Sequence, residues 1–303
     1  MKQIQGIIAL FMLVTLTSVY SRIAPKFDKS IAFDYLVKQC EFGPRDPGSA
    51  GHQACLKFFI SEFNKTANIV ERQDFLFQIP QKNTTHLCTN IIAKYNPSEK
   101  QRILLCAHWD TRPWADLDPV ISNRNKPIPG ANDGASGVAV LLEIARHLKQ
   151  SPPPIGIDIV LFDAEDAGLY GSDETWAIGS KEFAKSIAGR YFPQFGILLD
   201  MIGDKNLDIY IEKNSNRAAP NVVQKVWDTA AQLGISEFIP VEKFLVSDDH
   251  VRLLDVGIRC IDIIDFDYDV WHTMQDVPEN CSPESLEKVG QVVLEVIYSG
   301  DYD

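Results

Sequence analysis

The stretch that decides the fold is IDIVLFDAED, Ile157–Asp166. Five of its first six residues are apolar, which predicts a buried β-strand. Three acids follow within four residues: Asp163, Glu165 and Asp166. Ligands of open α/β sheets bind just beyond the carboxyl ends of the strands, so this turn is a candidate site. A single turn of this kind is better interpreted as a solvated acidic loop, but the pattern recurs along the chain.

Two other predicted strands also end in polar side chains. The apolar run Arg102–His108 leads into AHWD, which places His108 and Asp110 at a strand end. The run Phe195–Asp200 is a further predicted buried strand and ends in Asp200. Because the same arrangement occurs three times, the acids and the histidine are expected to meet at one edge of the sheet.

Acids also occur where helices are expected to begin. GANDGASG, residues 130–137, opens the amphipathic helix predicted at Val138–Lys149. No Lys follows the glycines and Asp133 would repel a phosphate, so this turn favours a cation. Ser247, Asp248, Asp249 and His250 are typical of the cap and first turn of a helix that ends near Val256.

The order of the elements predicts a single α/β domain with a central mixed, mostly parallel β-sheet flanked by helices. Strands at 90–95 and 102–108, separated by a turn, are expected to form a hairpin or neighbouring strands. A strand at 258–264 contains Asp262, a charge that needs a buried partner. The remaining predicted helices lie at 27–40, 50–63, 178–188, 220–233 and 283–298, and the remaining strands at 69–79 and 207–212.

Composition and charge exclude several classes of partner. The 303 residues include 29 basic and 41 acidic side chains, for a formal charge of −12, which argues against binding nucleic acid or an anionic membrane. A hydrophobic content of 45% supports a sizeable core. The six cysteines match no zinc motif, and their even number in an exported protein predicts one or two disulfide bonds.

The first 21 residues have the pattern of a signal peptide. Lys2 precedes an apolar run at 7–14, and small residues follow up to Ser21. The run is too short to span a bilayer, and no Cys follows closely enough for a lipid anchor. We therefore expect residues 1–21 to be removed on export and residues 22–303 to form one catalytic domain, periplasmic or secreted.

Taken together, the strand ends and helix starts expose histidines and carboxylates in one set. A mixed His and carboxylate set is typical of a catalytic zinc centre, whereas a calcium site would lack the His. The alternative is that each His is a satisfied core or cap residue. The set comprises His108, Asp133, Glu165, Asp166, Asp200, Asp248, His250 and His272.

Five motifs, in this order, resemble the zinc aminopeptidase superfamily and, within it, the animal-type glutaminyl cyclases and their bacterial relatives. The resemblance implies a zinc aminopeptidase-like fold and one Zn²⁺ per chain, held by Asp133, Asp166 and His272. It also implies that Glu165 transfers the proton, with Asp200 and Asp248 as a supporting hydrogen-bond pair. The motifs are GANDGASG, FDAED, LLDMIG, SDDH and WHTMQD.

The same resemblance implies the substrate-binding positions Trp271, Trp176 and Asp262. Asp262 stands where the animal enzymes have a His, and Asp166 stands where they have a Glu as zinc ligand. The loop after Asp166 also differs, and Ser247 replaces a Gln before the acid pair. These departures indicate a bacterial branch of the family.

The implied activity is that of a glutaminyl-peptide cyclotransferase, an acyltransferase. It converts the N-terminal Gln of peptides and proteins to pyroglutamate and releases ammonia, and we expect a monomer without a membrane anchor. A two-zinc aminopeptidase is the nearest alternative, because His108 and Asp200 could bind a second zinc. A noncatalytic binding module should have lost a ligand or Glu165, and this chain retains them.

Overall fold

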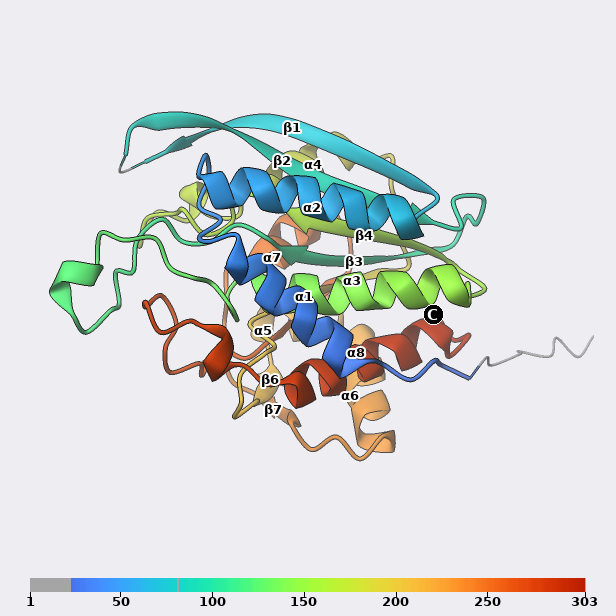
Figure 1. Ribbon diagram of the computed structural model, residues 1–303. Coiled ribbons are helices and arrows are strands. Elements are labelled where there is room, and N and C mark those ends of the chain that lie inside the picture. Colours follow the sequence, from blue (N-terminus) through green and yellow to red (C-terminus); the bar gives the residue numbers. More distant parts are fainter. Residues whose placement is uncertain (1–22, 81, 303) are drawn as a thin grey trace, which may run out of the picture.

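The computed structural model describes residues 23–80 and 82–302 of the chain (Figure 1). The predicted signal peptide, residues 1–21, lies outside these described residues. A six-stranded sheet in the order β1-β2-β4-β3-β5-β8 forms the centre, and β6 and β7 form a small separate sheet. The predicted single α/β domain is therefore confirmed.

The central sheet is mixed, as predicted. β1 pairs with β2 and β2 pairs with β4 in antiparallel fashion, whereas the β4-β3, β3-β5 and β5-β8 pairs are parallel. The expected adjacency of the second and third strands is wrong, because β4 lies between β2 and β3. The strands are β1 (Ile69–Ile79), β2 (Thr84–Tyr95), β3 (Arg102–His108), β4 (Gly156–Phe162), β5 (Phe195–Asp200), β6 (Ile209–Ile211), β7 (Phe238–Glu242) and β8 (Cys260–Ile264).

Helices cover both faces of the sheet. In Figure 1 α1, α2, α3 and α8 lie in front of it, while α4 and α7 lie behind. The helices are α1 (Lys29–Glu41), α2 (Ala50–Thr66), α3 (Ala135–Gln150), α4 (Ile178–Ile187), α5 (Lys213–Ala218), α6 (Pro220–Gln232), α7 (Asp249–Leu254) and α8 (Pro283–Tyr298), with short 3₁₀ turns at η1 (Ile121–Asn123), η2 (Asp173–Thr175) and η3 (Pro278–Asn280).

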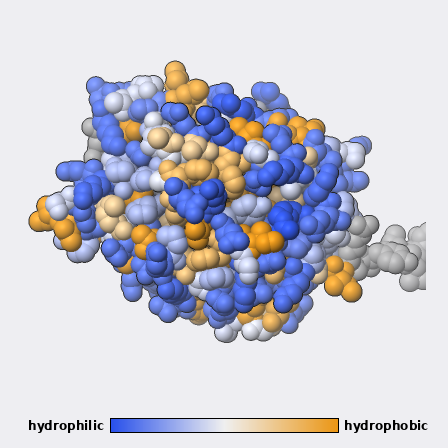
Figure 2. All heavy atoms as spheres, in the orientation of Figure 1, coloured by the Kyte–Doolittle hydropathy of each residue, from blue (hydrophilic) through white to orange (hydrophobic). Residues whose placement is uncertain are grey.

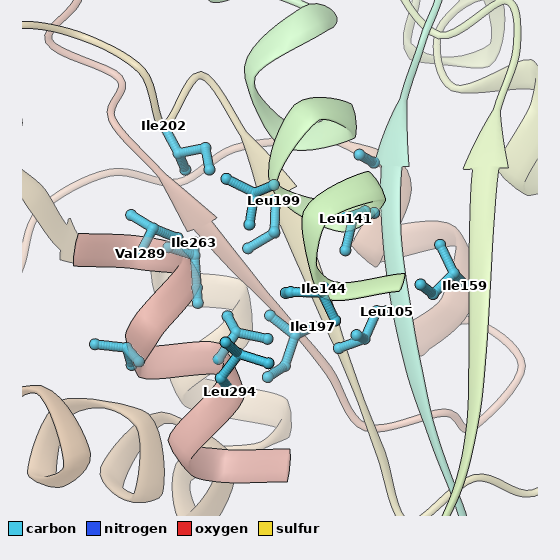
Figure 3. Close-up of a cluster of buried hydrophobic side chains, with 14 of the residues drawn as sticks. Leu105, Leu141, Ile144, Ile159, Ile197, Leu199, Ile202, Ile263, Val289 and Leu294 are labelled. Atoms are coloured by element: carbon cyan, nitrogen blue, oxygen red, sulfur yellow. The ribbon is translucent and has the colours of Figure 1, made fainter. Parts of the chain in front are cut away.

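Alternation along the buried strands builds a core on each face. Leu105 of β3 belongs to the core under α3 and α8, whereas its neighbours Leu104 and Cys106 pack with Phe183 of α4 and Leu253 of α7. Successive side chains of a strand point to opposite faces, so one apolar strand serves both cores. Figure 3 shows the first core, with Ile159, Ile197, Leu199 and Ile263 of the strands facing Leu141 and Ile144 of α3 and Val289 and Leu294 of α8.

The start of the described chain packs against its last helix. A Cβ atom on Gly290 of α8 would lie 2.2 Å from the ring of Phe27, so the absence of a side chain there makes room for the ring. The backbone N–H of Phe27 donates to Oε1 of Gln291 over 2.9 Å. The two ends of the described sequence therefore share one part of the core.

The middle of the segment 109–129, around η1, projects from the body of the molecule at the left of Figure 1. Its tip exposes Leu117, Val120 and Ile121, and Figure 2 shows hydrophobic atoms there. Within the described residues no helix is long and apolar enough to cross a bilayer. All six cysteines are free thiols, so the expected disulfide bonds are not formed.

Candidate metal centre and active site

The parallel strands β3, β4 and β5 end at the same edge of the sheet, as the sequence predicts, and a cavity of about 210 Å³ opens there. Its wall combines carboxylates, one imidazole and aromatic rings. The lining includes Asp133, Glu165, Asp166, Tyr170, Trp176, Asp200, Leu245, Val246, Asp248, Phe266, Trp271 and His272.

Asp133, Asp166 and His272 come together on one side of this cavity. One ligand atom from each lies within 4.8 Å of the others. Nε2 of His272 is 3.1 Å from Oδ1 of Asp166 and 3.4 Å from Oδ2 of Asp133. Oδ2 of Asp133 and Oδ2 of Asp166 are buried without a hydrogen-bond partner. Buried polar atoms normally have a partner, so this set fits a metal ion.

Close backbone packing explains the glycines beside Asp133. A Cβ atom on Gly134 would lie 2.4 Å from the carbonyl oxygen of Asp110, and one on Gly137 would lie 2.2 Å from that of Leu199. The carboxylate of Asp276 accepts the backbone N–H of Asp133 over 3.1 Å. The glycines therefore allow the start of α3 to pack closely against β5, and Asp133 lines the cavity.

Asp110, two residues after the end of β3, fixes the turn that follows β4. Oδ1 and Oδ2 of Asp110 accept the backbone N–H groups of Glu165 and Asp166 over 3.0 and 3.2 Å. Ala164, just before them, has φ of 57°. Left-handed backbone at a residue other than glycine is strained and is often found at functional sites. Asp110 is a positioning residue whose role the sequence did not reveal.

His272 is fixed through its other ring nitrogen and its backbone. The hydroxyl of Tyr170 lies 2.8 Å from Nδ1, which leaves Nε2 facing the two carboxylates. A hydrogen-bonded partner on the distal nitrogen is the usual way in which proteins orient a metal-binding histidine. The residue has φ of 55°, a second left-handed position at this site. Tyr170 lies in an aperiodic loop, so no sequence pattern identified it.

Arg112 contacts both the metal set and the aromatic rings of the cavity wall. Its buried guanidinium donates to Oδ1 of Asp166 over 3.3 Å and pairs with Asp116 over 2.6 Å. The aromatic rings of Trp114, Tyr170 and Trp176 surround it, with centroids 4.8 to 5.1 Å away. Cation–π contacts of this kind strengthen when the cation is desolvated. Arg112 thus ties a carboxylate of the metal set to the aromatic wall.

A second group shares Asp133. Nε2 of His108 lies 3.2 Å from Oδ1 of Asp133 and 3.1 Å from Oδ1 of Asp200. The ligand atoms of these three residues also lie within 4.8 Å of one another. Asp133 therefore faces two imidazoles, one through each oxygen, and the pair of groups could hold two metal ions.

The site is rich in carboxylates and poor in cations. Burial, reinforced by Asp248, raises the pKa of Glu165 well above its ordinary value. Burial also raises the pKa of Asp166 to about 7, although Arg112 opposes the shift. It lowers the pKa of His272 to about 3, which keeps the imidazole neutral, the form that binds metal. A divalent cation would offset the excess of negative charge.

The aromatic positions expected from the sequence, Trp271 and Trp176, both line the cavity. Asp262 is fully buried and is not among the residues that line the cavity. The resemblance implied a hydrogen bond between Asp200 and Asp248, but the described residues show none. Asp200 pairs with His108, whereas Asp248 caps α7 and its Oδ2 has no partner.

Comparisons with known proteins identify the family of this chain. The model of Peptidase family M28 matches residues 90–297. The crystal structure of Bacteroides thetaiotaomicron glutaminyl cyclase bound to N-acetylhistamine is 40% identical, with a TM-score of 0.87, covering 91% of this chain and 99% of that one. A structure described as a leucine aminopeptidase precursor, from strain VPI-5482 of the same species, gives the same identity and TM-score over 91% and 98% of the two chains.

A curated relative extends the similarity to animals. The glutaminyl-peptide cyclotransferase of the snake Boiga irregularis is 25% identical over 285 residues, which cover 82% of this chain and 75% of the relative. The family match spans most of the described chain and includes every residue of the metal set. The chain therefore belongs to peptidase family M28 and, within it, to the glutaminyl cyclases.

Proposed function

We propose that this protein is a zinc-dependent glutaminyl cyclase that converts the N-terminal Gln of peptides and proteins to pyroglutamate with loss of ammonia. The observation that carries the proposal is the arrangement at the cavity. Asp133, Asp166 and His272 face a space of about 210 Å³ that Glu165 and several aromatic rings also line. A cavity of this kind suits a small side chain that must fold back on its own amine.

One catalytic Zn²⁺ is proposed for this cavity, held by Asp133, Asp166 and His272. When bound, it would polarise the γ-amide carbonyl and stabilise the negative charge that develops on its oxygen. The donor set of one imidazole and two carboxylates matches that of catalytic zinc sites, which keep a position open for substrate. The unpartnered oxygens of Asp133 and Asp166 support this assignment.

Glu165 is the proposed proton carrier. Its carboxyl group would take a proton from the α-amine as the new C–N bond forms, and give it to the γ-amide nitrogen as that C–N bond breaks and ammonia leaves. Such a transfer typically contributes about 10²–10⁴ in rate. The hydrogen bond from its backbone N–H to Asp110 supports a fixed position for Glu165.

The aromatic wall would orient the substrate. Trp271, Trp176, Tyr170 and Phe266 line the cavity, and the Arg112 contacts immobilise two of these rings. A rigid wall holds the glutaminyl side chain against its amine, which supplies the entropic part of the acceleration. Asp200 and Asp248 are proposed as acids that support Glu165, because both line the same cavity.

The second candidate function is a two-metal aminopeptidase. The group His108, Asp133 and Asp200 favours it, as does the similarity to a structure described as a leucine aminopeptidase precursor. In that reaction a metal-activated water attacks the first peptide bond, so a Gln peptide would lose its first residue. Cyclisation instead keeps every residue of the peptide and converts the free α-amine into the amide of the pyroglutamyl ring.

The two functions are separated by the product from a peptide that begins with Gln. We expect ammonia and a peptide lighter by about 17 Da, the mass of the ammonia expelled in ring closure. Mass spectrometry and an amino-acid assay on the same reaction measure both. Free glutamine appearing without the pyroglutamyl peptide would reverse the assignment in favour of the aminopeptidase.

Location and assembly complete the proposal. We propose that residues 1–21 direct export and are removed, and that residues 22–303 act as a monomer in the periplasm or outside the cell. The pattern of Lys2 and the apolar run at 7–14 supports this. N-terminal sequencing of the protein recovered from an expressing host tests removal, and an intact Met1 would contradict it. Light scattering tests the assembly, and a mass larger than that of one chain would contradict the monomer.

A further inference from the structure

A third His–carboxylate group lies behind the cavity wall. Asp248, His250 and Asp262 each offer a ligand atom within 4.8 Å of the others. His250 and Asp262 have no exposed surface, and Asp248 is 4% exposed. The group belongs neither to the Asp133, Asp166 and His272 set nor to the second group around His108.

Two elements, α7 and β8, bring these side chains together. Asp248 is the N-cap of α7, and His250 lies in the first turn of that helix. Asp262 is the central residue of β8, between Ile261 and Ile263, which belong to the core under α3 and α8. Because side chains alternate along a strand, Asp262 points to the opposite face, toward α7.

The group contains several unpartnered buried atoms. Both side-chain oxygens of Asp262, Oδ2 of Asp248 and Nδ1 of His250 have no hydrogen-bond partner in the described structure. Burying a carboxylate without a hydrogen-bond or charge partner is unfavourable. Oδ2 of Asp262 lies 3.5 Å from Nδ1 of His250, and ligand atoms of all three residues lie within 4.8 Å of one another, so a cation fits among them.

Glu212 fixes which nitrogen of His250 is available. Its Oε2 lies 3.2 Å from Nε2 of His250, and the backbone N–H groups of Asn214 and Ser215 donate to the same carboxylate. Glu212 is the acceptor in these contacts, since its carboxylate receives both backbone N–H groups. The imidazole therefore donates from Nε2 to Glu212 and directs Nδ1 toward Asp262. A carboxylate on the distal nitrogen is the arrangement found behind metal-binding histidines.

The spacing also matches a metal site. Nδ1 of His250 lies 3.5 Å from Oδ2 of Asp262, at the limit for a hydrogen bond. Two ligands bound to one tetrahedral zinc at about 2.0–2.1 Å lie about 3.3 Å apart. The corresponding distances at His272 are 3.1 and 3.4 Å, so the two groups have similar dimensions.

We propose that Asp248, His250 and Asp262 form a second zinc site, buried and separate from the one proposed for catalysis. One imidazole and two carboxylates are a donor set suited to Zn²⁺. The ion would join the start of α7 to the middle of β8 and neutralise the carboxylates there. Asp248 also lines the cavity, so the ion would fix one part of its wall.

Metal analysis of matched variants tests the proposal. Wild type, D262N, H272A and the double variant are saturated with Zn²⁺, freed of unbound metal by gel filtration and assayed by mass spectrometry for zinc. D262N should hold one equivalent fewer than wild type, and H272A should keep the equivalent that D262N loses. The double variant should lack both. Zinc content in D262N equal to that of wild type would overturn the proposal.

A matched control removes a different buried carboxylate. Asp265, three residues further along the chain, is also fully buried, but it accepts the backbone N–H groups of Asp208 and Asp267. D265N should therefore retain all of its zinc, whatever it does to thermal stability. Equal zinc loss in D265N and D262N would show that destabilisation alone releases the ion, and would contradict a specific site.

Anomalous diffraction at the zinc edge keeps the proposal testable if D262N does not fold. Wild-type crystals should show a peak between His250 and Asp262, in addition to any peak at His272. A second peak among His108, Asp133 and Asp200 with none at His250 would overturn the proposal and support the aminopeptidase. The inference does not rest on cyclisation, so a protein without cyclase activity can still show the peak at His250.

Discussion

Two buried clusters of His and acid lie close to the turn that follows β4, and they differ in how their hydrogen bonds are used. In the paired cluster, Nε2 of His52 lies 3.0 and 2.9 Å from the two oxygens of Asp163, which also accept the backbone N–H groups of Thr89 and Ala164. In the metal cluster, Asp133, Asp166 and His272, two carboxylate oxygens have no partner.

The difference shows that residue type alone does not identify a metal site. The paired cluster also includes Cys88 and satisfies the same distance criterion for a metal ion as the metal cluster. Its polar atoms are already satisfied, so His52 and Asp163 need no cation. Unsatisfied, buried and convergent ligand atoms are the more informative signal. The following predictions are designed to break or sharpen this contrast.

The largest effect is expected from H272A. Loss of the only imidazole in the metal cluster should release the proposed catalytic zinc and abolish cyclisation, because the two remaining carboxylates bind Zn²⁺ weakly. Zinc analysis and ammonia release are measured on the same sample, with thermal melting as a check on folding. Full activity in a metal-free H272A protein would refute the assignment of the metal cluster.

E165Q should separate the proton carrier from the ligands. Glutamine keeps the shape of Glu165 but cannot accept the amine proton, so kcat should fall by at least about 10² while zinc stays bound. Single-turnover kinetics and zinc analysis distinguish the two effects. Zinc loss that parallels the loss of activity would instead make Glu165 a ligand.

Y170F should lower the affinity of the metal cluster for zinc without abolishing zinc binding. The substitution keeps the ring beside Arg112 and removes the hydroxyl that lies 2.8 Å from Nδ1 of His272. Loss of such a partner typically lowers metal affinity by about 10–100-fold. Competition with a chelator gives the affinity, and an unchanged value would show that Tyr170 does not orient His272.

The smallest effect on activity is expected from H52L, a substitution in the paired cluster. H52L leaves Asp163 buried without its imidazole and should lower the free energy of unfolding by about 1–3 kcal/mol. Zinc content and kcat should remain those of wild type at temperatures where the variant is folded. Denaturant unfolding measures the first change, and H52Q, which can still donate one N–H to Asp163, is the milder control. Zinc loss in H52L would mean that the paired cluster also holds metal.

The positions of the candidate site could be predicted because parallel strands place their carboxyl ends together. Apolar runs predict the exact boundaries of β3 and β5, whose last residues are His108 and Asp200, and the acidic turn after β4 contains Asp166. Local chemistry predicts that residues 247–250 form the cap and first turn of a helix, and the structure has Asp248 as the N-cap of α7. These signals are local, so the sequence is sufficient to read them.

The rest depends on contacts between distant segments. Arg112 and Tyr170 lie in aperiodic loops, and their roles arise only when Asp166 and His272 are brought beside them. The insertion of β4 between β2 and β3 is likewise a long-range pairing that no turn between the two strands reveals. The resemblance implies that Asp262 contacts substrate, whereas the alternation of β8 points its side chain toward α7 and it is not among the residues that line the cavity.

The contact between Phe27 and the helix α8 has a consequence for the time course of folding. The hydrogen bond from Phe27 to Gln291 joins residues separated by 264 positions. Contacts between residues so far apart in sequence are slow to form, because a large loop must close first. A chain still emerging from the ribosome cannot complete this part of the core until α8 has been synthesised. Closure of the core against α8 is therefore expected to be a late, post-translational step, detectable as delayed protection of α1 and α8 amides in pulse-labelling hydrogen exchange.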